Sequence, residues 1–374
     1  MSSGIQRSWT QGTLKDLVFF QRGFDITKAD QKEGEIPVIS SSGLTSYHNE
    51  AKVAGPGIII GRKGSLGTVH FSECPYWPHD TTLWSKDIKG NNPRYIYYFL
   101  KTLGLERFDV GNSNPTLNRN HIHDMNIAIP PKGVQEGIVE ILSPYDSLIE
   151  NNRRRIQLLE EAARLLYQEW FIRFRFPGYE HTKIVDGVPE GWITCKISEV
   201  CYTIGGGTPS TSNPEYWGGD VVWATPTDIT KNDCIFLPDT ERKISQLGLK
   251  NSSAKIVPPG TILMTSRASI GFFGVMDKET STNQGFINII PNDPWNKWYL
   301  TYNLISRVEE IRSNASGSTY KEISKGRFRE MLIVVPTKII ASEFEERCNY
   351  FFELIRNLKL QQIKLLEGRD LLLP

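Results

Sequence analysis

Two polar runs and two short basic segments hold many of the hydrogen-bond donors that stand close together in this sequence. One run lies between Asn112 and His121 and the other between Tyr320 and Arg329, and each basic segment follows an apolar stretch. The residues singled out are Arg62, Lys63, Asn112, Asn114, Asn118, Arg119, His121, Arg267, Tyr320, Lys321, Lys325, Arg327 and Arg329. Arginine and lysine suit guanine edges, asparagine suits adenine, and all three hold phosphates. We interpret the runs as candidate DNA contacts, although a solvated loop is the commoner role of any one such residue.

The sequence contains no recognisable catalytic motif. Gly61–Gly67 has the spacing G-x-x-G-x-x-G, which is typical of a turn and differs from a phosphate-binding loop. Asn92–Tyr95 lacks the second proline of the tetrapeptide found in amino-methyltransferases. Pro238–Lys243 contains the residue types of a nuclease site, but within six residues, whereas such a site needs them on adjacent strands. His121 and His123 have no third ligand nearby, so we predict no metal site.

The composition is that of an ordinary globular chain. Its 374 residues are 39% apolar and 23% charged, which suits two domains of roughly 150 residues with connecting elements. Lys+Arg total 43 and Asp+Glu 42, which argues against a polycationic tail but leaves room for a local basic face. The five cysteines form no C-x-x-C pair, and no window approaches 18 uninterrupted apolar residues. We expect a cytoplasmic protein without disulfides, zinc or membrane contact.

The elements that must position the candidate contacts occur twice. Five segments recur in one order, at offsets between 203 and 207: Pro56–Ile60 with Pro259–Leu263, Gly64–Gly67 with Ala268–Gly271, Gly111–Asn114 with Gly317–Tyr320, Met125–Pro130 with Met331–Pro336, and Ile156–Glu160 with Ile363–Glu367. Each set contains a proline-glycine turn, an apolar strand, a polar loop and a β-type run closed by proline. We infer a duplicated domain, because chance rarely repeats five segments in order.

The two copies differ between the matched segments. Ser8–Thr10 aligns with Gly191–Ile193 at an offset of only 183, so the first copy carries about twenty extra residues ahead of Pro56. The connecting loops also diverge, as in His70–His79 against Gly274–Thr282. Two copies of one domain that differ in their loops indicate two different binding specificities on the same fold.

A heptad pattern follows each copy. The first seam consists of Ile138, Leu142, Tyr145, Ile149, Asn152, Ile156, Leu159, Ala163, Leu166 and Trp170, and the second of Phe344, Cys348, Phe351, Ile355 and Leu358, continued by Ile363, Leu365 and Leu366. We predict an antiparallel coiled coil, with Asn152 helping to fix the register. The residues predicted to pair are Ile149, Asn152, Ile156, Leu159, Phe351, Ile355 and Leu358. The alternative is that each helix packs only on its own domain.

The expected fold is therefore α+β (mixed α/β), with two tandem homologous domains joined by two long antiparallel helices in pseudo-two-fold symmetry. Ser143-Pro144 indicates a short helix followed by a long one, and Pro177-Gly178 ends the pattern. From Pro144 to Trp170 an α-helix measures roughly 40 Å, close to one turn of B-DNA. The predicted boundaries are residues 1–142 for the first domain, 143–178 for the central helix, 179–190 for a linker, 191–336 for the second domain and 337–374 for the last helix.

In this plan the chain resembles the specificity (S) subunit of type I restriction–modification systems. The strongest local resemblance is Glu169–Gly178 at the end of the central helix, followed by Val188–Trp192 at the start of the second domain. Gly64–Gly67, Thr282–Phe286 and the proline closures ahead of each helix also fit. Two departures stand out: Arg7-Ser8-Trp9 replaces Pro-Glu-Gly-Trp at the start of the first domain, and the last helix lacks an equivalent of Phe171–Pro177.

The resemblance implies a DNA sequence-specificity subunit without catalysis of its own. Each domain would be a target-recognition domain that reads half of a bipartite, asymmetric site in double-stranded DNA. The helices would set the spacer and dock two methyltransferase (M) subunits, which restriction (R) subunits join. S-adenosylmethionine, ATP and Mg would belong to those partners, making the assembled complex an adenine-DNA methyltransferase and ATP-dependent endonuclease. The alternatives are a coiled-coil protein–protein scaffold without DNA contact, and a duplicated two-domain enzyme with cryptic sites.

Overall fold

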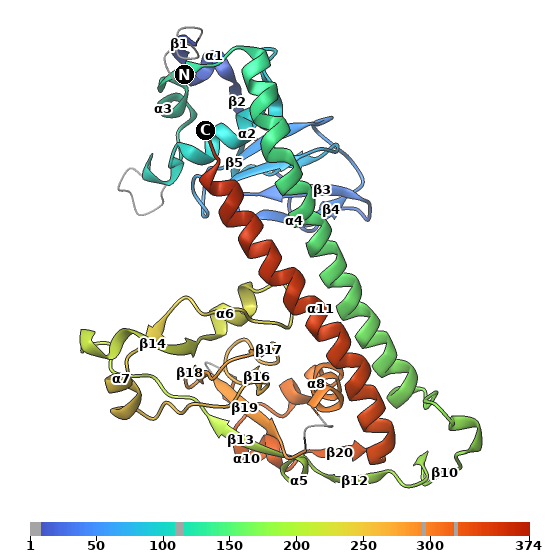
Figure 1. Ribbon diagram of the computed structural model, residues 1–374. Helices are drawn as coiled ribbons and strands as arrows, with labels where there is room; N and C mark the ends of the chain where they lie inside the picture. The colour runs from blue at the N-terminus through green and yellow to red at the C-terminus, as the bar shows by residue number, and fades with distance from the viewer. Residues whose placement is uncertain (1–8, 109–115, 294–296, 318–320) are drawn as a thin grey trace. The chain divides into compact units, whose positions relative to one another are not determined.

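The computed structural model describes residues 9–108, 116–293, 297–317 and 321–374 (Figure 1). Contacts between Cα atoms divide the chain into two units. The first unit comprises Met1–Ile149 and Leu365–Pro374, and the second comprises Glu150–Lys364. The two long helices each contribute residues to both units.

The described residues of the first unit form three small sheets. A four-stranded antiparallel sheet has the order β2-β8-β5-β6, a three-stranded sheet has the order β4-β3-β7, and β1 pairs with β9. The strands are β1 (Thr10–Thr13), β2 (Phe19–Arg22), β3 (Ile36–Ser40), β4 (Gly43–His48), β5 (Gly57–Gly61), β6 (Val69–Ser72), β7 (Trp77–Pro78), β8 (Thr82–Asp87) and β9 (Asn126–Ile129). The shorter helical elements are α1 (Leu14–Leu17), α2 (Pro93–Thr102), η2 (Leu105–Phe108) and α3 (Arg119–His123).

The second unit repeats these sheets in the same order. Here β13-β19-β16-β17 matches the four-stranded sheet, β15-β14-β18 the three-stranded one, and β12-β20 the pair; β10 and β11 form a further ribbon. The strands are β10 (Ile184–Val185), β11 (Val188–Pro189), β12 (Ile193–Lys196), β13 (Cys201–Gly205), β14 (Trp217–Ala224), β15 (Lys243–Ile244), β16 (Ile262–Thr265), β17 (Phe273–Val275), β18 (Ser281–Thr282), β19 (Phe286–Pro291) and β20 (Leu332–Val335). The shorter helices are η4 (Tyr179–His181), α5 (Ile197–Val200), η5 (Pro214–Tyr216), α6 (Pro226–Lys231), α7 (Gln246–Lys250), α8 (Lys297–Ser306), α9 (Val308–Ser313) and α10 (Lys325–Arg329).

The strand registers confirm the duplication and correct one part of its alignment. Ile60 lies opposite Leu83 in the first unit, and Met264 lies opposite Ile287 in the second, so both strands of the pair share an offset of 204. Aligning the two proline-glycine turns predicted an offset of 203 for Pro56–Ile60. That prediction is wrong by one residue for the strand. Both β5 and β16 are buried along their whole length, so they show no in-out alternation from which sequence could fix the register.

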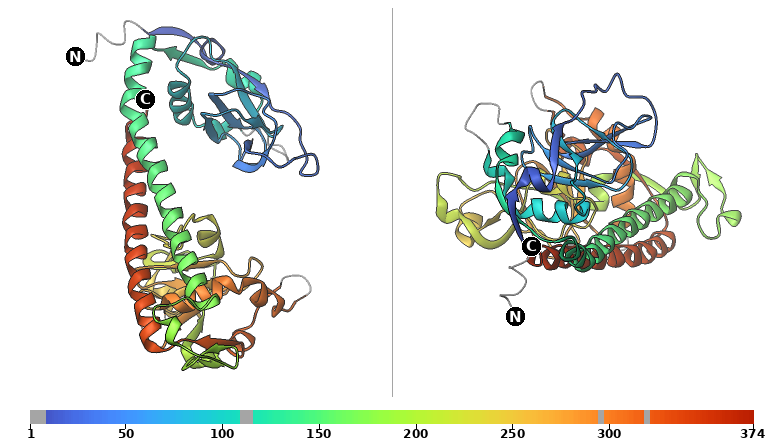
Figure 2. Two further views of the ribbon diagram at one scale, coloured as in Figure 1. Left: turned by 90° about the vertical axis from the view of Figure 1, so that its right-hand side faces the viewer. Right: turned by 90° about the horizontal axis from the view of Figure 1, so that it is seen from above.

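The two long helices are α4 (Lys132–Tyr167) and α11 (Lys338–Leu371). The expected break at Ser143-Pro144 is wrong, because α4 runs through Pro144 without interruption. After Tyr167 the chain passes into the π-helical turn η3 (Gln168–Ile172), so the helix ends before Pro177-Gly178. Within the second unit α4 and α11 lie side by side and run antiparallel, as both views of Figure 2 allow the reader to follow.

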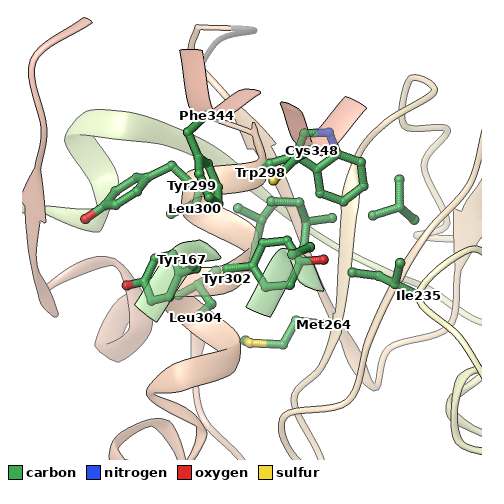
Figure 3. Close-up of a cluster of buried hydrophobic side chains, with 14 of the residues drawn as sticks. Tyr167, Ile235, Met264, Trp298, Tyr299, Leu300, Tyr302, Leu304, Phe344 and Cys348 are labelled. Carbon is green, nitrogen blue, oxygen red and sulfur yellow. The ribbon is translucent and has the colours of Figure 1, made fainter. Parts of the chain in front are cut away.

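The core of the second unit lies where these helices meet α8. The Tyr167 ring of α4 stands 6.1 Å from Tyr299 and 6.4 Å from Tyr302 of α8, and 6.3 Å from Phe344 of α11, measured between ring centroids (Figure 3). Asn303 donates to the Tyr167 hydroxyl at 3.1 Å, so this buried phenol is also hydrogen-bonded. Aromatic burial of this extent strongly favours attachment of the helix pair to the second domain.

A ring of phenylalanines surrounds Trp192 immediately ahead of β12. The ring centroids of Phe171, Phe174 and Phe176 lie 5.7, 5.6 and 5.4 Å from that of Trp192. Phe174 adopts a left-handed backbone conformation with φ of 56°, which turns the chain back on itself after η3. The Glu169–Gly178 segment therefore packs on the first residues of the second domain. In the described residues no helix is both long and apolar enough to cross a membrane.

Candidate nucleic-acid interface

The loop that follows β5 has the same backbone geometry as the loop that follows β16. The Arg62 N–H donates to the Thr81 carbonyl at 2.8 Å, and the Ser266 N–H donates to the Gly285 carbonyl at 2.8 Å. Gly64 and Ala268 occupy the same left-handed position, with φ of 78° and 59°. Ala268 has a Cβ in a region that glycine prefers, so the surrounding bonds hold this loop in a defined shape.

Each loop is joined to the polar run that the sequence singled out in the same domain. The Leu117 N–H donates to the Arg62 carbonyl at 2.9 Å, and the Ile323 N–H donates to the Ser266 carbonyl at 3.0 Å. Isolated bridges also pair Lys63 with Thr116 and Arg267 with Glu322. Segments that are more than fifty residues apart in sequence thus form one surface in each domain.

A capped helical turn presents the second half of each run. The Asn118 side chain accepts from the Asn120 N–H at 3.0 Å at the start of α3, and Ser324 accepts from the Arg327 N–H at 3.2 Å at the start of α10. Capping residues of this kind fix the first turn of a helix. The exposed side chains that follow the caps are Arg119, His121, Lys325, Arg327 and Arg329.

His123 plays a structural part, unlike its exposed neighbour His121. Its Nε2 accepts from the buried Phe20 N–H at 3.0 Å, which requires the neutral ring with the proton on Nδ1. Burial, aided by Arg119, lowers the pKa of His123. His123 is therefore engaged within the fold, whereas His121 is exposed.

The first domain collects arginines around one side of this surface. Arg62 is half-buried, and its Nη1 atom is buried with no hydrogen-bond partner among the described residues. Burial and the neighbouring Arg22 lower the pKa of the Arg62 guanidinium. Sequence reasoning missed Arg22, which ends β2 and is distant in sequence from both predicted runs. The one sequence feature that could have indicated Arg22 is a charged residue at the end of a predicted strand.

Arg22 is held in place by a small polar network. Its Nη2 donates to the Asp80 carboxylate at 2.8 Å, and His79 Nδ1 lies 3.1 Å from the other carboxylate oxygen. The ligand atoms of Asp25, His79 and Asp80 lie within 4.8 Å of one another, a grouping that sequence spacing did not reveal. We interpret it as the support of Arg22, because a metal ion would compete with the guanidinium for Asp80.

The second domain carries a different set of charges on the same surface. Arg267 lies 3.9 Å from the Glu322 carboxylate, and Arg327 donates to Asn314 at 2.7 Å. Lys321 and Arg329 are exposed, and the Lys321 carbonyl accepts from Ala268 N–H at 3.0 Å. Asn112, Asn114 and Tyr320 lie outside the described residues.

The predicted helix-pairing residues lie along the contact between α4 and α11. In the second unit Ile156, Ile355, Leu358 and Asn152 are buried, whereas Leu159 and Phe351 are half-buried against the same core. Ile149 is half-buried in the first unit. Sequence reasoning missed the buried polar residues of α11, which include Gln362 and Arg369, because an apolar periodicity does not detect them.

Comparison with known proteins agrees with this architecture. A family model described as the type I restriction modification DNA specificity domain matches residues 6–161 and 189–365. The MjaIX type I restriction enzyme specificity subunit of Methanocaldococcus jannaschii is 35% identical over 194 residues, which are 51% of this chain but only 45% of that protein. The HindI specificity subunit of Haemophilus influenzae is 26% identical over 322 residues, 70% of each chain.

A solved structure shares the fold. The crystal structure of a type I restriction–modification S subunit from M. genitalium superimposes with a TM-score of 0.59 at 15% sequence identity, covering 100% of this chain and 96% of that one. The two matches of the family model coincide with the two structural repeats. The chain therefore belongs to the type I restriction–modification DNA specificity family and carries two copies of its domain.

Proposed function

We propose that this chain is the DNA sequence-specificity subunit of a type I restriction–modification complex, and that its two domains each read one half of a bipartite, asymmetric site. The main support for the proposal is that the two domains share one backbone geometry at this surface but have different side chains at equivalent positions. Lys63 and Arg267 occupy equivalent bridge positions, and Asn118 and Ser324 equivalent caps. Phosphate contacts only position a protein on DNA, whereas side chains that differ at one place can read different bases.

A docking function for the helices is supported by a second apolar stripe, which runs along α4 and ends at Ile172 in η3, away from the seam. In the second unit Leu158, Leu165 and Ile172 recur every seven residues and are 53%, 46% and 58% exposed. In the first unit Ile141 and Leu148 show the same spacing and exposure. An apolar stripe of heptad period on a solvated helix is typical of a surface that binds another helix. The proposed occupants are helices of methyltransferase subunits.

Under this proposal the chemistry belongs to the partners. S-adenosylmethionine would be bound by the methyltransferase subunits, and ATP and Mg by the restriction subunits. The specificity subunit would supply only base recognition, spacing and assembly. This division agrees with a sequence that contains no recognisable catalytic motif.

The decisive experiment is to co-express the chain with its methyltransferase subunit in cells that lack other adenine methylation, and to map methylated adenines across the genome. We expect two short half-sites centred about one helical turn, roughly ten base pairs, apart. A single contiguous motif would contradict the bipartite reading. A complex that assembles but fails to bind duplex DNA at low salt would favour the protein–protein scaffold, because phosphate contacts are strongest there.

A further inference from the structure

The first domain contains a cavity that is lined in part by three arginines. The cavity measures about 490 Å³ and is lined by Arg22, Arg62, Leu83, Thr116, Asn118 and Arg119. These residues come from the end of β2, the loop after β5, the start of β8 and the segment that leads into α3. Three arginines on one cavity wall repel each other unless an electron-rich group lies between them.

One residue that lines this cavity has a donor without a partner. The Nη1 atom of Arg62 is buried and makes no hydrogen bond within the described part of the chain. A buried donor without an acceptor destabilises a fold, so the few that persist need a physical explanation. A ligand acceptor that enters the cavity would supply the missing bond.

The neighbouring arginine is oriented before any ligand binds. The Asp80 carboxylate accepts from Arg22 at 2.8 Å and is itself only 17% exposed, whereas the Arg22 side chain is 54% exposed. One side of the guanidinium is therefore anchored on the protein and the other faces solvent. A planar fork held in this way can donate to two acceptors on one flat group.

The second domain lacks this arginine cluster at the same place in its frame. Arg22 lies opposite Leu83 in its ladder, and Gly205 lies opposite Ile287 in the matching ladder of the second domain. By the same hydrogen-bond patterns Arg62 corresponds to Ser266, and Arg119 to Lys325. A Cβ built on Gly205 would lie 3.2 Å from the Lys325 ammonium, so a single lysine occupies the space there.

This difference separates base recognition from phosphate binding. A phosphate contact is independent of sequence, so both domains would need it at equivalent positions. A base contact is expected to change from one domain to the other. Guanine offers two acceptors, O6 and N7, on one edge in the major groove, and arginine is their commonest partner.

We propose that Arg22, Arg62 and Arg119 form a guanine-reading pocket of the first domain, with Arg62 supplying the inward donor and Arg22 and Arg119 the flanking ones. The proposal rests on the function proposed above and specifies it further. It assigns at least one G·C pair to the half-site that the first domain reads. It also assigns a different chemistry to the equivalent position of the second domain.

The test uses the full chain with its methyltransferase subunit and the genome-wide methylation map. In Arg62→Lys the charge stays but the fork is lost, and Arg119→Lys repeats the test at an exposed residue that the fold does not require. We expect discrimination at one G·C pair of one half-site to fall by about tenfold or more, with the other half-site unchanged. Lys86→Gln, an exposed lysine of β8 that does not line the cavity, is the control for loss of one positive charge and should leave the motif unchanged.

Two results would overturn the pocket. In the first, both arginine variants weaken methylation equally at every site, and their DNA binding depends less on salt than that of the unmodified protein. This combination is typical of lost phosphate contacts. The half-sites of the unmodified protein could also contain no specified G·C pair. If the unmodified complex yields no bipartite motif at all, the proposed function itself fails, and this outcome is visible before any variant is made.

Discussion

The Arg369 guanidinium of α11 donates from Nη1 to Oδ1 of Asp146 on α4 at 2.7 Å. The Tyr98 hydroxyl of α2 donates to the other oxygen of the same carboxylate at 2.6 Å. Only 7% of the Arg369 side chain and 21% of Asp146 are exposed. One carboxylate therefore joins both long helices to a helix of the first domain.

Replacing Asp146 by alanine should destabilise the first unit by about 2 kcal/mol, because the buried Tyr98 phenol and Nη1 of Arg369 lose their acceptor, while Nε and Nη2 of Arg369 keep Asp370. Urea unfolding of the full chain measures this loss. The control is Arg164→Ala, which breaks an exposed pair with Glu161 three residues away and should change little. Equal effects of the two substitutions would show that the Asp146 contact is no stronger than a surface ion pair.

Asn152 and Gln362 should behave as a coupled pair in the seam. Both are buried, and the helix pairing that brings Trp170 to Phe344 also brings Asn152 level with Gln362. Replacing either residue alone by leucine should destabilise the pair by about 1–2 kcal/mol, because it leaves one buried polar group with an apolar neighbour. The double substitution should recover stability. A double-mutant cycle in urea checks this, and strictly additive effects would contradict the pairing.

Glu160 gives the protein a defined dependence on pH. Its Oε1 accepts from the Ile235 N–H at 2.6 Å, and burial raises its pKa to about 7. Because the pKa is raised on folding, the stabilisation is complete below the unfolded value near 4.5 and is lost as pH rises through 7. Glu160→Gln keeps an acceptor oxygen and removes the charge.

We therefore expect the glutamine variant to match the unmodified protein near pH 4.5, and to exceed its stability above pH 7 by about 3 kcal/mol. Urea unfolding at several pH values measures the difference. Glu161→Gln, on the exposed face of the next position, is the matched control and should show no such trend. A constant difference between Glu160→Gln and the unmodified protein across this range would contradict the raised pKa.

Much of the order of strands and helices could be predicted from the sequence, because a segment that recurs in both halves is identified more securely than one that occurs once. The β-type runs that end in Pro130 and Pro336 are the strands β9 and β20, and the seam around Ile156 and Ile355 is buried. The one-residue error at β5 arose because a fully buried strand has no alternation. The continuous helix through Pro144 was missed because a local breaker signal was outweighed by tertiary packing on both sides.

The interface was harder to predict than the frame. Arg62 and Arg119 were found because they stand in basic or polar runs, whereas Arg22 reaches the same cavity from the end of β2, where Asp80 anchors it. Their proximity is a property of the β2–β8 ladder and has no counterpart in sequence spacing. Buried polar residues such as Gln362 could not be predicted for a similar reason, since burial of a polar group depends on its partner.

The exposed stripe on α4 predicts which substitutions affect assembly without affecting folding. Leu165→Glu together with Ile172→Glu should leave the unfolding free energy nearly unchanged, because both side chains are already solvated. The same change should abolish co-purification of the methyltransferase subunit. Arg164→Ala, about 100° further round the helix, should leave assembly intact. Retained co-purification in the double variant would place the partner elsewhere.

The length of the paired helices should set the spacer of the DNA site. Removing seven residues from each helix, Ile149–Arg155 from α4 and Asn357–Ile363 from α11, shortens the pair by about 10 Å and preserves the phase of the seam. At about 3.4 Å per base pair, the methylation map should show a spacer shorter by about three base pairs with both half-sites unchanged. Removing only three residues from each helix rotates the seam and should abolish assembly. An unaltered spacer in the seven-residue deletion would show that the helices dock partners without measuring DNA.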